Sequence, residues 1–266
     1  MKIGARAHDF GKHSPEALFE IMKEKGLEAA HFAPYKALEL EGDFLLEKNL
    51  LRTRDALQAN HLEMTVLGCY VEPGSLDEGV FQASLEKFIA HLCVAKEVGT
   101  GCVGTETSPC ADADREAQYV QVFRFMKEAV KVAEEADAVI GVEPVFRHTI
   151  NTPQMLKRLL DDIDSPRLKV IFDPVNLLWE GNVSEQEDLW AECIHLWGDE
   201  VVAIHLKDGI YSGNSYTPTD WGKGVARFEK IAEWAKTKRP DLTLLREEIK
   251  PETAKSDIAA IKALFC

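Results

Sequence analysis

Five polar side chains stand near the ends of apolar runs in the second half of the chain. They are Glu106 in VGTETS, Glu143 in IGVEPVF, Asp173 in VIFDPVN, His205 in VAIHLKD and Glu247 in LLREEI. Each follows several mainly apolar residues, so each is buried if its run forms a strand. A buried carboxylate without a partner is unfavourable, and the fold must therefore supply a proton, a counter-charge or a metal ion.

A divalent cation is the simplest way to neutralise this set. Two carboxylates can share a proton and one can pair with His205, but four acids and one histidine are harder to balance. The basic residues at matching depth are few, namely Arg6, Lys207 and Arg246. Carboxylate oxygens with one imidazole suit Mn²⁺, Mg²⁺, Co²⁺ or Zn²⁺, and the missing thiolates argue against a structural zinc. For His205 alone, a buried ring satisfied by its neighbours is the alternative.

Short apolar runs alternate with longer amphipathic segments along the whole chain. The runs are rich in Val, Ile, Leu and Thr, as expected for strands buried on both faces of a parallel sheet. The predicted strands cover residues 2–7, 28–33, 63–70, 102–107, 139–145, 168–174, 201–207 and 242–249.

Helical patterns with start and stop signals fill the spaces between these strands. Ser14, Pro15 and Glu16 supply a cap, a first-turn proline and a first-turn acid, and Gly26 ends the same helix. Apolar residues at helical spacing predict further helices over 76–98, 115–136, 151–163, 226–236 and 253–265.

This alternation predicts a parallel sheet with right-handed crossovers. An open, doubly wound sheet usually carries GxGxxG after its first strand, whereas HDFGKHSPE follows here. Eight strand–helix units within 266 residues favour a closed (β/α)8 TIM barrel. No Gly/Ser-rich linker divides the chain, so we expect a single domain over residues 1–266, with its chemistry at the carboxyl ends of the strands.

Composition excludes several classes of partner. The net charge of -14 and the pI near 5.1 disfavour binding to nucleic acid or to an acidic membrane surface. The N-terminus lacks the features of a signal peptide, and no apolar run is long enough to span a bilayer. The cysteines lack CxxC spacing and indicate reduced thiols, so we expect a cytoplasmic protein; they are Cys69, Cys93, Cys102, Cys110, Cys193 and Cys266.

The motifs resemble the xylose isomerase-like barrels of sugar isomerases, epimerases and related enzymes. GVEPV, IFDPVN, AIHLKDG and LLREEI occur in the order, and on the strands, where that family places its metal ligands. The resemblance implies one divalent ion, with manganese favoured over magnesium, cobalt or zinc, bound by Glu143, Asp173, His205 and Glu247. WGKG at 221–224 is similar to the Gly-x-Gly loop of the family.

The chain departs from the family pattern in two places. Many members carry a histidine three residues after the strand-six aspartate, where this chain has Asn176. The additional histidines and acids with which the endonuclease branch binds three zinc ions are not found, so that branch is disfavoured.

The resemblance implies isomerisation or epimerisation next to the carbonyl of a small sugar or sugar derivative. Such a reaction removes a proton from carbon while negative charge develops on oxygen. A metal stabilises that charge, while Glu143 and Glu247 take and return protons. Epimerisation needs two bases on opposite sides of the carbon, and isomerisation needs one. The family pattern favours Glu247 over Glu248, whose side chain points to the other side of the strand.

Further polar and aromatic residues are candidates for contact with the substrate. Most of them have a structural alternative. His148 can be an ordinary loop histidine, Asn176 a helix cap and Lys207 a partner of Asp208, while Trp179 and Trp221 can pack under loops. The candidates are His148, Asn176, Lys207, Trp179, Trp221 and Glu106.

Two other functions fit the same sequence. A metal-dependent dehydratase of a polyol or keto acid would expel a hydroxyl from the same kind of carbanion, and a barrel without catalytic activity would serve as a binding subunit. In every case the expected partner is a small-molecule carbohydrate, without nucleic acid or membrane, and a homo-oligomer is compatible with the resemblance.

Overall fold

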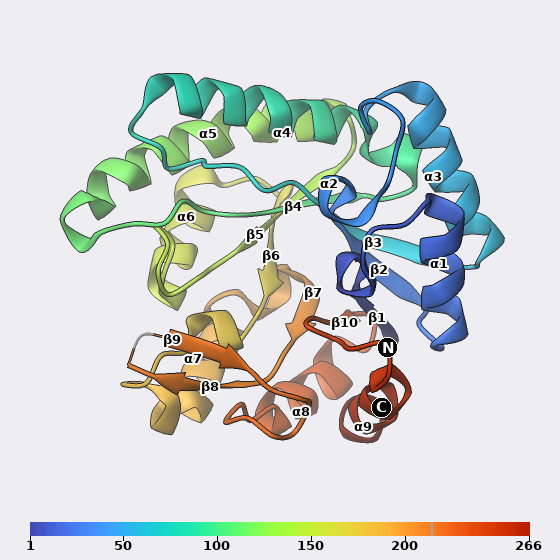
Figure 1. Cartoon of the computed structure of the whole chain (residues 1–266). Helices are drawn as coiled ribbons and strands as arrows, with labels where there is room; N and C mark the ends of the chain where they lie inside the picture. The colour runs from blue at the N-terminus through green and yellow to red at the C-terminus, as the bar shows by residue number, and fades with distance from the viewer. Residues whose placement is uncertain (214) are drawn as a thin grey trace.

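Short apolar segments form the eight parallel strands of a closed barrel, seen in the computed structural model, which describes residues 1–213 and 215–266 (Figure 1). Around the barrel the strands follow the order β1, β10, β7, β6, β5, β4, β3, β2. Their bounds are β1 Lys2–Arg6, β2 Ala29–Phe32, β3 Glu63–Gly68, β4 Cys102–Glu106, β5 Val139–Glu143, β6 Leu168–Phe172, β7 Val201–Leu206 and β10 Thr243–Arg246. The predicted TIM barrel is therefore confirmed.

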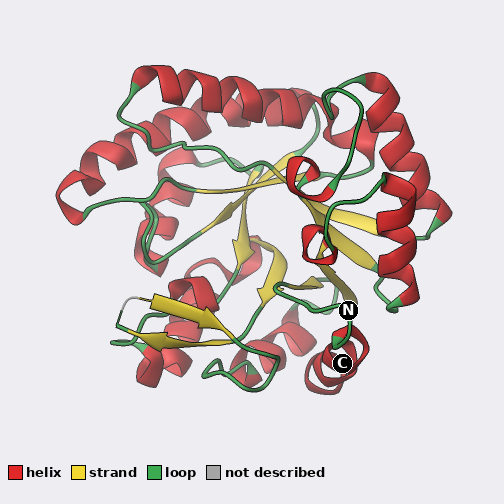
Figure 2. Cartoon of the chain, viewed as in Figure 1, coloured by secondary structure: helices red, strands yellow, loops and turns green. Residues whose placement is uncertain are grey.

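Helices surround the barrel and cover its outer face (Figure 2). They are α1 Pro15–Glu24, α2 Pro34–Ala37, α3 Glu47–Ala59, α4 Glu78–Val98, α5 Arg115–Glu135, α6 Pro153–Ile163, α7 Gln186–Trp197, α8 Glu229–Lys238 and α9 Ala254–Phe265. Short 3-10 helices cover Ala7–Phe10, Asp112–Asp114, Val175–Leu177, Val183–Glu185 and Gly198–Glu200.

Side-chain caps fix where two of the predicted helices begin. Ser14 Oγ accepts a hydrogen bond from Ala17 N at 3.4 Å, and Pro15 occupies the first position of α1. Thr152 and Pro153 play the same parts at the start of α6. In both helices the side chain satisfies a backbone N–H that has no partner within the helix.

The barrel interior has an apolar floor of its own. Its members come from different strands and form a cluster separate from the main core: Ala29, Val66, Cys102, Ile171, Ala203 and Leu245. Side chains alternate along a strand, so His205, two residues after Ala203, points to the same interior as this floor. The floor therefore lies beneath any site at the carboxyl ends of the strands.

Most strands end earlier than the sequence predicted. β10 ends at Arg246 instead of residue 249, and β6 ends at Phe172 instead of residue 174. The residues that follow leave the strand ladder and turn their side chains toward the barrel mouth, among them Asp173 and Glu247. The apolar run predicts the strand, but its end is set by these polar residues.

Further features differ from the sequence-based expectation, which gave no range for α3 or α7. A hairpin of β8 Gly209–Ser212 and β9 Ser215–Pro218 follows β7 and stands apart from the barrel strands (Figure 1). The helix expected over 226–236 runs from Glu229 to Lys238, because Ala226 N and Arg227 N donate to Asp208 and Gln186 instead of continuing a helix. Among the described residues, no helix has the length and apolar character needed to cross a bilayer.

Candidate active site

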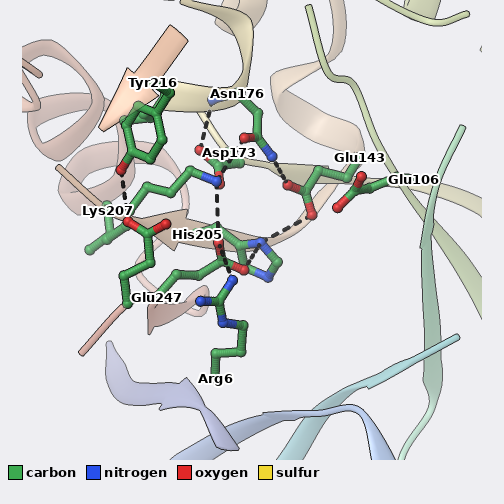
Figure 3. Close-up of polar contacts among 12 residues, drawn as sticks. Arg6, Glu106, Glu143, Asp173, Asn176, His205, Lys207, Tyr216 and Glu247 are labelled. Carbon is green, nitrogen blue, oxygen red and sulfur yellow. Dashed lines mark hydrogen bonds and ion pairs between the residues drawn. The ribbon is translucent and has the colours of Figure 1, made fainter. Parts of the chain in front are cut away.

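Glu143, Asp173, His205 and Glu247 meet at the carboxyl ends of β5, β6, β7 and β10 (Figure 3). One potential ligand atom from each of Glu143, Asp173 and His205 lies within 4.8 Å of the others, and the same holds for His31, His205 and Glu247. All five side chains are buried. Since a metal ion binds such ligands at about 2.0–2.6 Å, groups this close can share one ion.

His205 lies at the centre of this group. Its Nδ1 is 3.1 Å from Glu143 Oε2 and 3.3 Å from Glu247 Oε1. Its Nε2 is 3.1 Å from His31 Nδ1. Burial opposes a charge on the ring, but the carboxylates of Glu143 and Glu247 outweigh it and raise the pKa of His205 to about 9. The imidazole therefore faces an environment that attracts positive charge.

His31, in β2, was missed by sequence reasoning. Its ring stacks on His205, with centroids 4.9 Å apart, and burial together with the charge of His205 lowers its pKa well below the usual value. Gly68 leaves room for the ring, since a Cβ at that position would collide with His31 Nε2. The signal was present in EAAHFA, where a histidine interrupts an apolar strand just as in AIHLKD.

Lys207 supplies a buried positive charge within the carboxylate group. Its Nζ lies 2.8 Å from Asp173 Oδ2 and 3.3 Å from Glu247 Oε2, and it donates to Asn176 Oδ1 at 2.7 Å. Burial opposes the ammonium charge, but Asp173, Glu247 and Glu143 outweigh it and raise the pKa of Lys207 well above its usual value. Lys207 therefore balances the acids, one of its two expected roles.

Asp208 does not pair with Lys207 but holds the loop that contains WGKG. Its carboxylate accepts hydrogen bonds from the backbone N–H groups of Gly222 at 3.0 Å, Gly224 at 2.9 Å and Ala226 at 3.2 Å, and from Gly209 N at 2.9 Å. The Gly-x-Gly amides are thus committed to a buried aspartate of the same chain.

Two carboxylates of the group differ in how easily they ionise. Burial raises the pKa of Asp173 to about 6, although Lys207 acts in the opposite direction. Burial also works against ionisation of Glu247, but Lys207, His205 and Arg6 outweigh it and hold the pKa of Glu247 well below its usual range. Arg6 Nη1 lies 3.4 Å from Glu247 Oε2.

The two consecutive glutamates after β10 point to different partners. Glu247 faces the cluster, whereas Glu248 Oε2 accepts a hydrogen bond from Tyr216 of the hairpin at 2.8 Å. Glu248 has a φ of 57°, in the left-handed region, and this conformation reverses the chain between the two residues. The position of Glu247 agrees with the family register.

Asn176 connects three members of the cluster. Its side chain donates to Glu143 Oε1 and accepts from Lys207, and its backbone N–H donates to Asp173 Oδ1 at 3.1 Å. The 3-10 helix over 175–177 has Pro174 at its N-cap and no side-chain cap, so capping is not the role of the Asn176 side chain. Asn176 instead fixes the orientation of Glu143 relative to Lys207.

Glu106 and His148 lie beside Glu143. Glu106 pairs with Glu143 in the ladder between β4 and β5, and burial together with the charge of Glu143 raises the pKa of Glu106 to about 7. His148 Nδ1 is 3.6 Å from Glu106 Oε2, and burial lowers the pKa of His148 to about 4. These two groups extend the polar lining away from His205.

The two candidate tryptophans lie in different places. Trp179 is 37% exposed and stacks on Phe146, with ring centroids 5.3 Å apart. Trp221 stacks on Phe228 at 4.9 Å, and the Arg246 guanidinium lies 5.6 Å from its ring centroid. Since Arg246 Nε donates to Asp257 of α9, these are packing contacts on the outer side of β10, where the helices lie.

The donor set fits a divalent cation. His205 Nδ1 is a buried atom for which no hydrogen-bond partner is found among the described residues. Its neighbours at 3.1 and 3.3 Å are the carboxylates of Glu143 and Glu247, which are potential ligands of the same ion. Three carboxylates and one imidazole match the preferences of Mn²⁺, Mg²⁺, Co²⁺ and Zn²⁺.

Comparisons with known proteins agree with this architecture. A crystal structure of a D-tagatose 3-epimerase-like protein has 20% identity and a TM-score of 0.80, covering 99% of this chain and 97% of that one. The apo 3-keto-D-glucoside 4-epimerase from E. coli has 18% identity and a TM-score of 0.79, covering 99% of both chains. D-psicose 3-epimerase from Clostridium cellulolyticum H10 has 13% identity and a TM-score of 0.79, covering 100% of this chain and 99% of that one.

At these identities the solved structures establish the fold alone. No curated protein sequence matches the chain. The model of the xylose isomerase-like TIM barrel family matches residues 19–264, nearly the whole length. The protein belongs to the xylose isomerase-like TIM barrel family.

Proposed function

We propose that this protein is a divalent-metal-dependent epimerase or isomerase of a small sugar or sugar derivative. One observation carries the proposal: Glu143 and Glu247 approach His205 Nδ1 at 3.1 and 3.3 Å from strands on opposite sides of β7. Two carboxylates placed in this way can act on two sides of a substrate carbon held between them.

Glu143, Asp173, His205 and Glu247 are the proposed ligands of a single ion. The ion would supply Lewis-acid stabilisation of the charge that develops on the substrate oxygen. Manganese is favoured because the donor set is rich in oxygen and contains one imidazole. A solved structure of the same fold, the IOLI protein at 16% identity, carries a bound zinc atom, which supports the binding of a divalent metal by this fold.

The side chains of this protein would move the proton. In epimerisation, one glutamate removes the proton from carbon and the other returns a proton to the opposite face. In isomerisation, one glutamate carries the proton between neighbouring carbons. Lys207 favours the ionised forms of Asp173 and Glu247, and Asn176 holds the Glu143 carboxylate by its Oε1 atom. Glu106, His148 and Trp179 remain proposed substrate contacts, whereas the contacts of Trp221 favour packing.

The proposal is tested by metal analysis and solvent exchange. Purified protein should contain about one divalent ion per chain, and the Asp173→Ala variant should lose it. With Mn²⁺ bound, a panel of ketoses incubated in D2O should take up deuterium at the carbon next to the carbonyl, as followed by NMR. A folded protein that binds no divalent ion and exchanges no substrate proton contradicts the proposal.

A dehydratase is the second candidate. A probable 3-DHS dehydratase, AsbF from Bacillus anthracis, shares the fold with a TM-score of 0.75 at 14% identity. The same proton abstraction leads to dehydration if a hydroxyl leaves the neighbouring carbon. Product analysis separates the two, since an epimerase conserves substrate mass and a dehydratase produces an unsaturated carbonyl compound with one water fewer.

A further inference from the structure

A cavity of about 250 Å³ opens beside the carboxylate cluster. It lies between the segment after β5, the 3-10 helix after β6 and the β8–β9 hairpin. The residues that shape it include Val145, Phe146, Arg147, Asn176, Tyr211 and Tyr216.

Asn176 joins this cavity to the proposed reaction site. The same side chain that lines the cavity donates to Glu143 Oε1 and accepts from Lys207 Nζ at 2.7 Å. Figure 3 shows Asn176 and Tyr216 on the same side of Asp173 and Lys207. The Asn176 side chain thus borders both the cavity and the Glu143 carboxylate.

The two tyrosines contribute their rings to the cavity, because their hydroxyl groups are already bonded elsewhere. Tyr211 donates to Val175 O at 2.6 Å, and the Tyr216 hydroxyl bonds Asp208 O and Glu248 Oε2 at 3.0 and 2.8 Å. The rings lie 5.5 Å apart with an interplanar angle of 52°. They form an apolar wall with a fixed orientation.

Phe146 forms a second aromatic wall, supported from behind. Trp179 stacks on it at an interplanar angle of 4°, which covers one face of Phe146 and leaves the rest of the ring for the cavity. Gly181 permits this arrangement, since a Cβ there would collide with the Trp179 ring. The cavity wall is therefore preorganised by a residue that does not line it.

Polar groups lie at the two ends of this aromatic space. Asn176 forms the inner end, and Arg147 lies exposed at the outer end, with no carboxylate within salt-bridge distance among the described residues. Aromatic walls with a few polar groups are the usual setting for a sugar ring, whose C–H face is apolar and whose edge carries hydroxyls. A cavity of about 150 Å³ accommodates benzene, so 250 Å³ is sufficient for a six-membered ring.

We propose that this cavity is a subsite for a second sugar ring, so that the substrate is a glycosylated ketosugar instead of a free monosaccharide. The inference rests on the proposed function, because it places the reacting sugar at Glu143 and Glu247. The second ring stacks between Phe146 and the two tyrosines, and its outer hydroxyls reach Arg147.

The test compares each ketosugar with its glucosylated form on the Mn²⁺-loaded protein. One set is D-fructose with maltulose, leucrose and palatinose, which carry glucose at different positions and keep the keto group. The second set compares methyl 3-keto-D-glucoside with a 3-keto-D-glucoside that carries a glucosyl group in addition. Isothermal titration calorimetry should show at least one glucosylated form binding about tenfold more tightly than its partner, equivalent to about 1.4 kcal/mol.

Three variants locate the added affinity. Val145→Trp fills the cavity from its rim and should abolish the gain, and Phe146→Ala should reduce it severalfold. Ile210→Ala is the matched control: Ile210 neighbours Tyr211 on β8, is 47% exposed and points to the other face of the hairpin, so the gain should persist.

The outcomes distinguish this inference from the proposed function. Equal affinities within every pair, or a gain that survives Val145→Trp, overturns the second-ring subsite. Proton exchange with the ketosugars is measured separately. If the protein exchanges protons but binds glucosylated and unglucosylated ketosugars equally, only the subsite proposal is contradicted. If the protein binds a glucosylated ketosugar more tightly but exchanges no proton, only the proposed epimerase or isomerase function is contradicted.

Discussion

The ammonium group of Lys207 lies 2.8 Å from the Asp173 carboxylate, inside the group of acids that forms the candidate metal site. Glu143, Asp173 and Glu247 together carry three negative charges when ionised, and Lys207 offsets one of them. Arg6 also approaches Glu247, but its own charge is paired with Asp9 at 2.8 Å. A divalent ion therefore offsets the remaining two charges if His205 is neutral.

Replacing Lys207 with methionine should destabilise the metal-free protein by about 3 kcal/mol, because it leaves buried carboxylates without their cation. Urea denaturation should show this loss, and saturating Mn²⁺ should reduce it, since the ion supplies positive charge to the same acids. Lys157→Met is the control: Lys157 pairs with Asp161 on an exposed helix face, where such pairs contribute about 0.5 kcal/mol. Similar losses in both variants would argue against a special role for Lys207.

Glu143→Gln and Glu247→Gln should each lower kcat by about 10²–10⁴-fold, because each removes a proposed base. In a two-base epimerase, each variant should retain deuterium exchange with one epimer while losing conversion between epimers. Glu248→Gln serves as control, since Glu248 faces Tyr216 and not the cluster. Full conversion by either single variant would be incompatible with two-base chemistry.

His31→Phe should weaken Mn²⁺ binding by about 10–100-fold, because a partner on the far nitrogen of a metal-binding histidine fixes its ring and tautomer. His31 Nδ1 lies 3.1 Å from His205 Nε2, opposite the nitrogen that faces the carboxylates. Calorimetric titration with Mn²⁺ measures the effect, and His31→Asn should retain part of the affinity. His91→Asn alters another buried histidine, bonded to Lys87 O in α4, and should leave metal binding unchanged.

Glu106 should make the metal-free protein less stable as pH rises. Its pKa is raised from 4.5 to about 7 in the fold, so between these values the folded chain binds more protons than the unfolded chain. Stability contributed by this group is therefore present below pH 4.5 and is lost as pH rises toward 7. The free energy of unfolding is measured for the wild type and for Glu106→Gln in the presence of a metal chelator. The value for the variant minus the value for the wild type should increase as the pH rises from 4.5 to 7. A difference that is independent of pH would contradict the raised pKa.

Asp208→Ala should destabilise the protein by about 3 kcal/mol or more, because several backbone N–H groups of the 222–226 loop lose their acceptor. Thermal and urea denaturation measure the loss. Asp220→Ala removes only an exposed pair with Lys250 and should have little effect. If Asp208→Ala is as stable as Asp220→Ala, the 222–226 loop does not need the Asp208 carboxylate to keep its structure.

The fold was predictable because local patterns and tertiary structure agree. A buried parallel strand needs a continuous apolar run, and a helix beside it needs a cap and an apolar face, as at Ser14 and Thr152. The grouping of Glu143, Asp173, His205 and Glu247 also followed, since residues late in parallel strands share one end of a barrel.

The remaining features depend on contacts between residues distant in sequence. The pair Gly213 and Asn214 between the runs IYS and SYT is a hairpin signal that sequence reasoning missed, whereas the bonds that hold the hairpin tyrosines to Val175, Asp208 and Glu248 are visible only in the structure. The partners of Lys207 lie after β6 and after β10, so its pairing with Asp173 instead of Asp208 becomes visible only in the assembled barrel. Of the two roles considered for Trp221, substrate contact and packing, its stacking on Phe228 favours packing, and the next residue, Gly222, donates to Asp208.

The left-handed residue after β10 makes two neighbouring carboxylates serve separate parts of the protein. Glu247 is fixed by the barrel, and Glu248 is tied through Tyr216 to the hairpin that walls the cavity. A single peptide unit thus couples the two regions mechanically. A displacement of the hairpin that preserves the Tyr216–Glu248 bond would therefore act on the residue next to the proposed base.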